Sequence, residues 1–482
     1  MEEFIKSING IVWGLPMLTL LLGTGLYLTI GLRFLSITKL PYAFGELFKK
    51  RDKSVEGDVS PFGALMTALS STVGTGNIAG VAAAIAIGGP GAVFWMWMTA
   101  IVGTATKYSE GVLALHYRET DEEGRHVGGP MYYIKNGMGK NWVWLGVLFA
   151  GLGIFASWGT GASIQANSIA DVLQSDYDVP PLITGIVLAA AAAAVILGGV
   201  QRISSVASKL VPFMALAYVS GGLIVIAMHI DAIPNAFGMI FRNAFGLDSA
   251  GTGIAIGLMM LAMQKGVARG IFSNEAGQGS APIAHAAAKN DNPVNQGIVA
   301  MLGTIIDTLI VCTITALVIL TAGVVGPECI PTAETAASFL KDGQPAGCDT
   351  SAPLTSAAFG SSLSWSIGGV ALGSHIVAIS LTIFAFTTIL GWSYYGERCC
   401  EFLFGIKSVL PFRISWIVVV FASAAVLMFE DKVENIVNLF WLMADTLTGM
   451  MAAPNLIALV VLSPVVIKLT RDYFKHWKDA KK

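Results

Sequence analysis

Eleven stretches of the 482-residue chain are apolar over lengths that can cross the hydrocarbon core of a bilayer, which is about 30 Å thick. Lipid offers no hydrogen-bond partners, so each stretch is predicted to be a helix that satisfies its own backbone. Only 12% of the residues are charged, whereas soluble domains carry about 25%. We therefore predict an all-α polytopic membrane protein with eleven transmembrane helices, at 10–32, 60–89, 91–116, 142–172, 181–200, 207–229, 252–287, 295–325, 366–396, 411–429 and 433–466.

Basic residues are distributed unevenly between the segments that connect these spans. If the N-terminus lies outside the cell, 22 of the 29 Lys and Arg residues fall on the cytoplasmic side and four on the outer side. Cytoplasmic loops are generally the ones enriched in Lys and Arg. We therefore predict a multi-pass protein of the cell membrane with its N-terminus outside and its C-terminus inside. This orientation places Cys329 and Cys348 in one outer loop, where they could form a disulfide.

Several classes of function find no support in the composition. The net charge is −2 and the basic residues are spread over many short loops, so no nucleic-acid surface is expected. The six His and five Cys residues are too few and too scattered to predict a zinc site, a haem site or a disulfide framework. No nucleophile–base pair or metal-ligand cluster marks a catalytic centre, so the chain is not expected to be an enzyme.

The apolar run 60–89 is interrupted near its centre by the sequence STVGTGNIAGV. As one helix this run would be about 45 Å long, which exceeds what the hydrocarbon core requires. Gly74 and Gly76 lower the cost of leaving helical geometry, so we expect two half-helices joined by unwound backbone at 73–77. Such backbone must line a cavity or be buried in protein. The alternative interpretation is that Gly76 and Gly80 form a close helix-packing face.

A second long run, 252–287, is interrupted in the same way by GIFSNEAGQGSAPIAHA. Two broken helices in corresponding places indicate a transport site near the middle of the bilayer. Without the first span, the other ten spans divide into two sets of five. Each set begins with a broken helix, and the odd number gives the two sets opposite orientations. We therefore predict an extra N-terminal helix with a cytoplasmic linker, a first repeat, a second inverted repeat and a basic cytoplasmic tail, at 1–59, 60–229, 230–466 and 467–482.

The motifs STVGTGNIAGV, GGPMYYI, GIFSNEAGQGSAPIAHA and FAFTTILGWSYYGE together resemble the alanine or glycine:cation symporter family. The resemblance extends over about residues 10–460. It implies a LeuT-type fold with a 5+5 inverted repeat, in which VGTGN is similar to the unwound first core helix. It further implies sodium-coupled symport of small neutral amino acids by alternating access. Sodium would be co-transported, no organic cofactor would be needed, and a monomer would suffice.

The resemblance also implies which residues meet the substrate. The N–H groups of Thr75 and Gly76 lie at the positive end of the second half-helix, where a carboxylate would bind. Carbonyl oxygens of Thr72 and of the second break, expected near Gly270–Ser273, would accept hydrogen bonds from the ammonium group, and Phe272 would form a wall or lid. Gln165 is either a substrate contact or an interhelical hydrogen-bond partner. The predicted substrate-binding set is Thr72, Thr75, Gly76, Asn77, Gln165, Gly270, Phe272, Ser273 and Asn274.

The third helix of the second set carries two adjacent hydroxyls in the sequence FAFTTIL. Sodium sites of the LeuT type combine such hydroxyls with carbonyl oxygens of the first broken helix, in keeping with the preference of hard cations for oxygen. The alternative is that each threonine only bonds the carbonyl four residues before it. The resemblance thus implies a sodium site formed by Ser70, Val73, Phe384, Thr387 and Thr388.

Ionisable residues at membrane depth leave a second coupling mechanism open. An isolated charge is costly there, so such residues usually have a function or a partner. Glu275 or Asp307 could carry a proton, which would make the chain a proton-coupled amino-acid transporter. Lys265, Arg269 and Asp445 are further residues of this kind, and the sequence does not reveal their partners.

Overall fold

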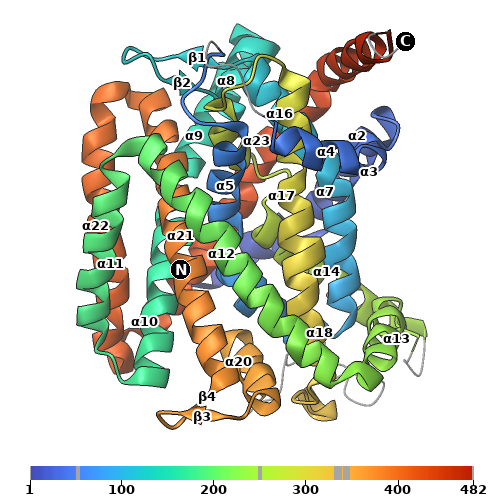
Figure 1. Cartoon of the computed structure of the whole chain (residues 1–482), viewed down its shortest axis with the longest axis vertical. Helices are drawn as coiled ribbons and strands as arrows, with labels where there is room; N and C mark the ends of the chain where they lie inside the picture. Colours follow the sequence, from blue (N-terminus) through green and yellow to red (C-terminus); the bar gives the residue numbers. More distant parts are fainter. Residues whose placement is uncertain (1, 50–54, 248–251, 330–338, 340–347, 480–482) are drawn as a thin grey trace.

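Long helices that run between two ends of the molecule dominate the computed structural model (Figure 1). Each end carries one short antiparallel hairpin. β1 (Glu119–Thr120) pairs with β2 (His126–Val127) at one end, and β3 (Ser366–Ile367) pairs with β4 (Val370–Ala371) at the other. The structure describes residues 2–49, 55–247, 252–329, 339 and 348–479.

The helices up to the middle of the chain are α1 (Glu2–Val12), α2 (Leu15–Gly31), α3 (Leu35–Thr38), α4 (Leu40–Leu47), α5 (Pro61–Thr72), α6 (Val81–Gly88), α7 (Gly91–His116), α8 (Pro130–Tyr133), α9 (Val143–Ala156), α10 (Ile164–Tyr177), α11 (Pro181–Ile196), α12 (Gly199–Met228) and α13 (Ile233–Ala244). Those that follow are α14 (Thr252–Asn274), α15 (Ala281–Ala286), α16 (Pro293–Ala300), α17 (Leu302–Thr304), α18 (Thr313–Thr321), α20 (Ser351–Ser362), α21 (Leu372–Phe404), α22 (Val409–Ala425) and α23 (Glu430–Asp479). Wider π-helical turns join some of them, at η1 (Gly76–Gly80), η2 (Ile134–Met138), η4 (Ser157–Ser163) and η6 (Ile305–Cys312). Short 3₁₀ turns are η3 (Lys140–Trp142), η5 (Ile230–Ala232), η7 (Pro327–Cys329), η8 (Ile406–Ser408) and η9 (Val426–Phe429).

Eight helical segments in the described part of the chain are long and apolar enough to cross a bilayer. The bent pair Pro61–Thr72 and Gly76–Gly88 raises this number to nine. The two remaining predicted spans, 91–116 and 181–200, coincide with α7 and with α11, which has only 16 residues. The predicted helical membrane fold is confirmed, whereas the count of eleven spans stays a prediction.

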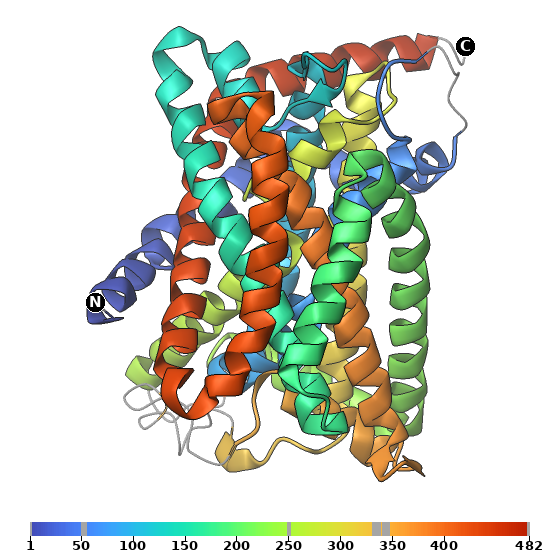
Figure 2. The same cartoon turned by 90° about the vertical axis from the view of Figure 1, so that its left-hand side faces the viewer.

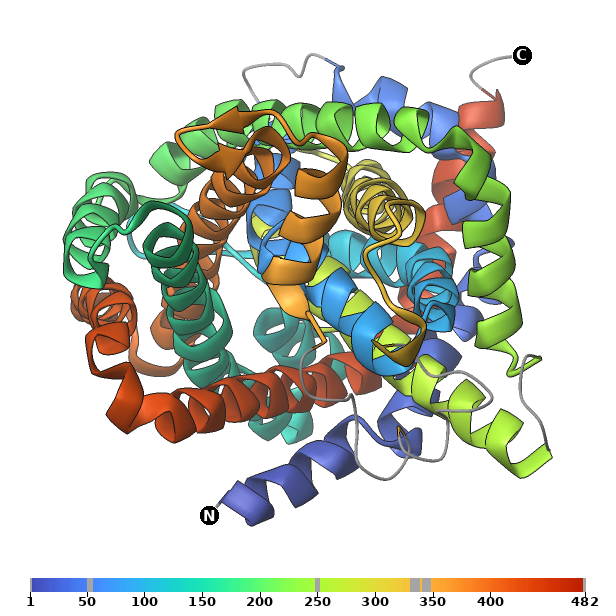
Figure 3. The ribbon, with the colours of Figure 1, turned by 90° about the horizontal axis from the view of Figure 1, so that it is seen from below.

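The first predicted break lies between α5 and α6, in the interior of the bundle (Figure 3). α5 starts where the Ser60 hydroxyl accepts a hydrogen bond from Gly63 N at 3.0 Å, with Pro61 in the first turn. It ends at Thr72, and Val73 is extended, with φ −76° and ψ 93°. The second half-helix is bent by 55° from the first. The interruption predicted for this run is therefore confirmed.

The second break lies later than its sequence indicates. α14 stays helical through Asn274, and Glu275 N still donates to Ile271 O at 2.8 Å. The backbone then turns through positive φ angles of 56° at Glu275, 87° at Gly277 and 86° at Gly279 before α15 begins. Glycine adopts such angles at little cost, so Gly277 and Gly279 allow the chain to unwind here, whereas Glu275 adopts its positive φ as a non-glycine residue. The expected break near Gly270 is thus corrected to residues 275–280.

The two ends of the bundle differ in what covers them. The end with the β1–β2 hairpin also carries α3, α4 and the last part of α23, which lies across it (Figure 2). At the opposite end, near β3 and β4, a disulfide joins Cys329 to Cys348, as predicted. Disulfides persist in oxidising compartments. This bond supports the predicted orientation, in which the β3–β4 end lies outside.

A buried cluster of charges closes the β1–β2 end, and we call it the Arg398 network. Arg398 of α21 is 2% exposed and lies 2.5 Å from Glu401, 3.6 Å from Asp121 and in contact with Glu397. Arg413 of α22 contacts Glu397 at 2.6 Å. The network therefore links α21 and α22 to the segment that carries β1 and β2.

Thiol labelling tests the orientation of the chain. In a Cys400→Ser background, Ser366→Cys is expected to react with an impermeant maleimide added to intact cells, because Ser366 is exposed beside β4. Glu122→Cys, exposed in the β1–β2 hairpin, is expected to react only after the cells are lysed. Labelling of residue 122 in intact cells would show that the chain has the opposite orientation to the predicted one.

Candidate functional site

Asn77 forms two hydrogen bonds with Gly74 across the first break. Its side-chain oxygen accepts a hydrogen bond from Gly74 N at 2.9 Å, and its own N–H donates to Gly74 O at 3.2 Å. The Thr72 hydroxyl, one residue before the break, bonds back into α5 at 3.3 Å from the Ala68 and Leu69 carbonyl oxygens. The break is therefore a fixed turn held by one amide side chain.

Gln165 of α10 reaches the backbone of this turn. Its side-chain oxygen lies 3.4 Å from Thr75 N, and its amide nitrogen donates to Thr160 O at 3.2 Å. The Thr75 hydroxyl is buried and has no hydrogen-bond partner among the residues that the structure describes. Gln165 thus occupies the position at which an anionic oxygen would meet the N–H groups of the break.

The two broken helices touch at Gly76. A Cβ atom placed on Gly76 would lie 3.1 Å from Phe272 Cδ1 and 3.3 Å from Ser273 Cα of α14. Arg269 lies over the Phe272 ring, with its guanidinium carbon 5.7 Å from the ring centre. Only glycine permits this approach without displacing α14. Gly270 has a similar role against α7, because a Cβ there would lie 2.3 Å from the Thr99 hydroxyl.

Asp307 of η6, which the sequence offers as a possible proton carrier, is the central hydrogen-bond acceptor beside the break. Its carboxylate accepts hydrogen bonds from Asn77 at 2.7 Å, from the Ser273 hydroxyl at 2.6 Å and from the Thr308 hydroxyl at 2.7 Å. It is fully buried, and no Lys or Arg of the described chain lies within ion-pair distance. A buried carboxylate among hydroxyl and amide groups is a candidate cation or proton site.

Asn274 connects the same cluster to the second break. Its amide nitrogen donates to the Thr308 hydroxyl at 3.1 Å, and its oxygen accepts from Ala276 N at 2.9 Å. This second bond holds the chain as it leaves α14. Asn274 therefore positions the break next to Thr308 and Asp307.

The two threonines of α21 face different neighbours. Both hydroxyls donate to the Phe384 carbonyl, at 2.9 Å from Thr387 and 3.0 Å from Thr388. A Cβ on Gly74 would lie 2.4 Å from the Thr388 hydroxyl oxygen, whereas the Thr387 hydroxyl lies 3.6 Å from the Met214 sulfur of α12. Thr388 is thus in contact with the first break, and Thr387 is turned away from it.

The remaining residues of the predicted sodium site lie at the end of α5. The Ser70 hydroxyl donates to Thr67 O at 2.7 Å, and both Ser70 and Val73 are fully buried. A Cβ on Gly391 would lie 2.0 Å from the Ser71 hydroxyl, so α5 and α21 approach closely here. All predicted site residues are buried except Phe272, which is partly exposed.

Other buried carboxylates near the second break have partners within the protein. Glu275 accepts a hydrogen bond from the Ser280 hydroxyl at 2.5 Å. Glu110 of α7 accepts from Asn455 at 2.7 Å and from Gly277 N at 3.2 Å. In the described part of the chain, no group of three or more His, Cys, Asp or Glu side chains could hold a metal ion. The oxygen-rich surroundings of Asp307 and Thr388 suit an alkali cation better than a transition metal.

The whole chain, residues 1–482, matches the model of the family described as "Sodium:alanine symporter family". The chain belongs to the sodium:alanine symporter family. Among its relatives, the sodium/alanine symporter AgcS of Methanococcus maripaludis is 48% identical, over 100% of this chain and 99% of AgcS. The probable sodium/glutamine symporter GlnT of Bacillus subtilis is 36% identical, over 100% of this chain and 92% of GlnT. This member of the family is therefore an amino-acid transporter of the membrane and not an enzyme.

Solved structures agree with the fold expected for this family. The structure of MhsT in complex with L-phenylalanine has a TM-score of 0.52 at 14% identity, over 86% of this chain and 98% of MhsT. A manganese transporter of Eremococcus coleocola has a TM-score of 0.51 at 12% identity, over 87% of this chain and 83% of that chain. These likenesses confirm the LeuT-type fold of the family member.

Proposed function

We propose that this transporter couples the uptake of alanine or glycine to sodium by alternating access. The observation that carries the proposal is the contact at Gly76 between the two broken helices. Backbone groups freed at such breaks bind the charged ends of a substrate, and the two helices that supply them can part or close around it. A monomer holds every residue of this site.

The substrate carboxylate would bind the N–H groups of Thr75 and Gly76 and displace the side-chain oxygen of Gln165. Thr75 N has only a long 3.4 Å bond to Gln165, and the Thr75 hydroxyl has no partner, so both groups gain a hydrogen bond on binding. The ammonium group would meet carbonyl oxygens of Thr72 and of the end of α14. The Phe272 ring lies beside Gly76, and we expect it to limit the size of the substrate side chain.

Sodium would bind where Thr388 meets the first break, with carbonyl oxygens of Ser70, Val73 and Phe384 as further ligands. The Thr388 hydroxyl already lies against Gly74, and a hydroxyl that donates to a carbonyl still has a lone pair for a cation. Asp307 offers a second oxygen cluster on the other side of the break. We leave Thr387 out of the ligand set because its hydroxyl faces Met214.

Uptake by the purified protein in liposomes tests the proposal. Labelled alanine and glycine are expected to accumulate under an inward sodium gradient and not when choline replaces sodium, because substrate binding and ion binding stabilise the same state. In a competition panel, glycine and alanine are expected to inhibit strongly and glutamine weakly, since Phe272 limits the space beside Gly76. Strong inhibition by glutamine with none by alanine would contradict the proposed substrate.

Proton coupling is the second candidate, and the buried carboxylate of Asp307 is the observation that favours it. A relative from Bacillus subtilis, 38% identical, is named a putative sodium/proton-dependent alanine carrier. In the same liposomes without sodium, an inward pH gradient separates the two mechanisms. Accumulation driven by the pH gradient alone would show that this transporter is coupled to protons and would contradict the proposed sodium coupling.

A further inference from the structure

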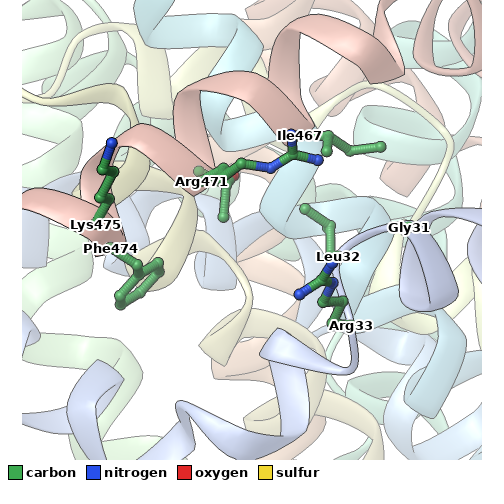
Figure 4. Close-up of a pocket in the computed structure, with 8 residues that line it drawn as sticks. Gly31, Leu32, Arg33, Ile467, Arg471, Phe474 and Lys475 are labelled. Carbon is green, nitrogen blue, oxygen red and sulfur yellow. The ribbon is translucent and has the colours of Figure 1, made fainter. Parts of the chain in front are cut away.

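A pocket of about 380 Å³ lies between the end of α2 and the last turns of α23, away from the transport site (Figure 4). Leu32 and Ile467 form part of its apolar lining. Arg33, Arg471 and Lys475 are the charged residues that line it. None of the eight lining residues is acidic, and none of these three cations forms an ion pair in the described part of the chain. The pocket therefore combines an apolar surface with uncompensated positive charge.

Arg33 stands in a backbone conformation that favours glycine. α2 ends in a turn in which Phe34 N donates to Thr29 O at 2.9 Å, and both Arg33 and Phe34 have positive φ angles, of 55° and 57°. Helices usually end this way with glycine at that position. A non-glycine residue is strained there, because its Cβ atom crowds the backbone. Strain of this kind is retained where the side chain has a use.

The surroundings of the pocket have the character of a membrane interface. α3, α4 and the last part of α23 gather at this end, and α23 lies across the spans there (Figure 2). Phe34 and Phe48 are 50% and 71% exposed, and Lys39 lies 5.2 Å above the ring of Phe474, which also lines the pocket. Exposed aromatic and basic side chains together are typical of segments at the level of the lipid head groups.

We propose that this pocket binds an anionic glycerophospholipid. The lipid phosphate would lie against Arg33 and Arg471, which line the pocket from the end of α2 and from α23 (Figure 4), and its first methylene groups against Leu32 and Ile467. Arginine forms paired hydrogen bonds with phosphate oxygens, and basic pockets at helix ends bind anionic head groups. A choline head group would bring a second cation to these arginines and Lys475, so a zwitterionic lipid binds less well. The site does not depend on the proposed transport function.

The test uses the full chain in detergent micelles doped with phosphatidylglycerol or with phosphatidylcholine. Phosphatidylglycerol is expected to raise the unfolding temperature more than phosphatidylcholine does, because a lipid that binds the folded state stabilises it. Native mass spectrometry is expected to show one retained phosphatidylglycerol. The double variant Arg33→Gly and Arg471→Gln is expected to weaken phosphatidylglycerol binding about tenfold or more, since two charge-assisted contacts are lost.

The single variant Arg33→Gly distinguishes an effect on lipid binding from an effect on the stability of the fold. Glycine relieves the positive φ, so the unfolding temperature in phosphatidylcholine is not expected to fall, while the preference for phosphatidylglycerol decreases. The matched control is Lys140→Gln with Lys407→Gln, two exposed cations at the same end of the bundle but outside the pocket. This control is expected to keep the preference.

Three results would overturn the proposal. Equal loss in the control pair would show that general surface charge attracts the lipid. Equal stabilisation by inorganic phosphate would show that the pocket binds a free anion and not a lipid. If the double variant Arg33→Gly with Arg471→Gln kept its preference for phosphatidylglycerol, the pocket would not be the site that binds this lipid.

Discussion

Gly76→Leu is expected to abolish binding of alanine and glycine while the protein stays folded and inserted. A Cβ atom at this position would already lie 3.1 Å from Phe272 and 3.3 Å from Ser273, so the remainder of a leucine side chain must enter the space between the first break and α14. That space is where the substrate carboxylate would reach the backbone N–H groups. Loss of one charge-assisted hydrogen bond costs about 1.5–3 kcal/mol, which is roughly 10- to 150-fold in affinity, and the steric clash adds to it.

Isothermal titration calorimetry in detergent measures this effect, and size-exclusion chromatography reports on folding. Gly80→Ala is the matched control, because a Cβ there has no neighbour closer than 4.0 Å and the residue lies one turn further along the same segment. Gly76→Ala is expected to fall between the two variants. Binding by Gly76→Leu at the affinity of the parent would exclude this location for the substrate.

Thr388→Ala is expected to raise the sodium concentration for half-maximal uptake by roughly 5- to 15-fold. The variant removes one neutral oxygen ligand, which is worth about 1–1.5 kcal/mol, and leaves α21 helical. Because coupling between sites is reciprocal, substrate affinity is expected to fall at low sodium and to recover at saturating sodium. A sodium titration of alanine uptake at two alanine concentrations measures both effects.

The adjacent Thr387→Ala is the control for this experiment. It removes the same atoms from the same helix, but the Thr387 hydroxyl faces Met214 instead of the first break. Its sodium dependence is expected to match that of the parent, and Thr388→Ser is expected to be mild because the hydroxyl is kept. An identical sodium dependence for Thr388→Ala and Thr387→Ala would place the ion elsewhere, with the cluster around Asp307 as the next position to vary.

Local features of this fold are readable from the sequence. Gly74 and Gly76 interrupt an apolar run that is too long for one span, so the first break follows from composition and length alone. The second break is harder to place, because several glycines compete for it. Gly270 serves close packing against Thr99, whereas Gly277 and Gly279 take the positive φ angles. The sequence alone does not distinguish a glycine that is needed for packing from one that is needed for turning.

Contacts between distant segments account for what the sequence does not reveal at the site. Asp307 stands out as a carboxylate in an apolar run, but its partners Asn77 and Ser273 lie 230 and 34 residues away along the chain. The roles of Thr387 and Thr388 depend on the rotation of α21, because consecutive residues of a helix point about 100° apart. Helix rotation is set by packing against neighbours, which only the folded bundle provides.

The Arg398 network bears on how readily the β1–β2 end of the molecule can separate. Burying these charged side chains costs their hydration free energy, and the attraction between them largely offsets this cost without much net stabilisation. When the segment carrying Asp121 moves away from α21, water replaces Asp121 beside Arg398, while Arg398 keeps Glu397 and Glu401 and Arg413 keeps Glu397. Separating an apolar contact of the same size would instead cost free energy in proportion to the apolar surface that becomes exposed to water. Separating charged contacts at this end therefore costs little free energy, because water can take the place of the lost partners. Such contacts suit a transport path that opens and closes in every cycle.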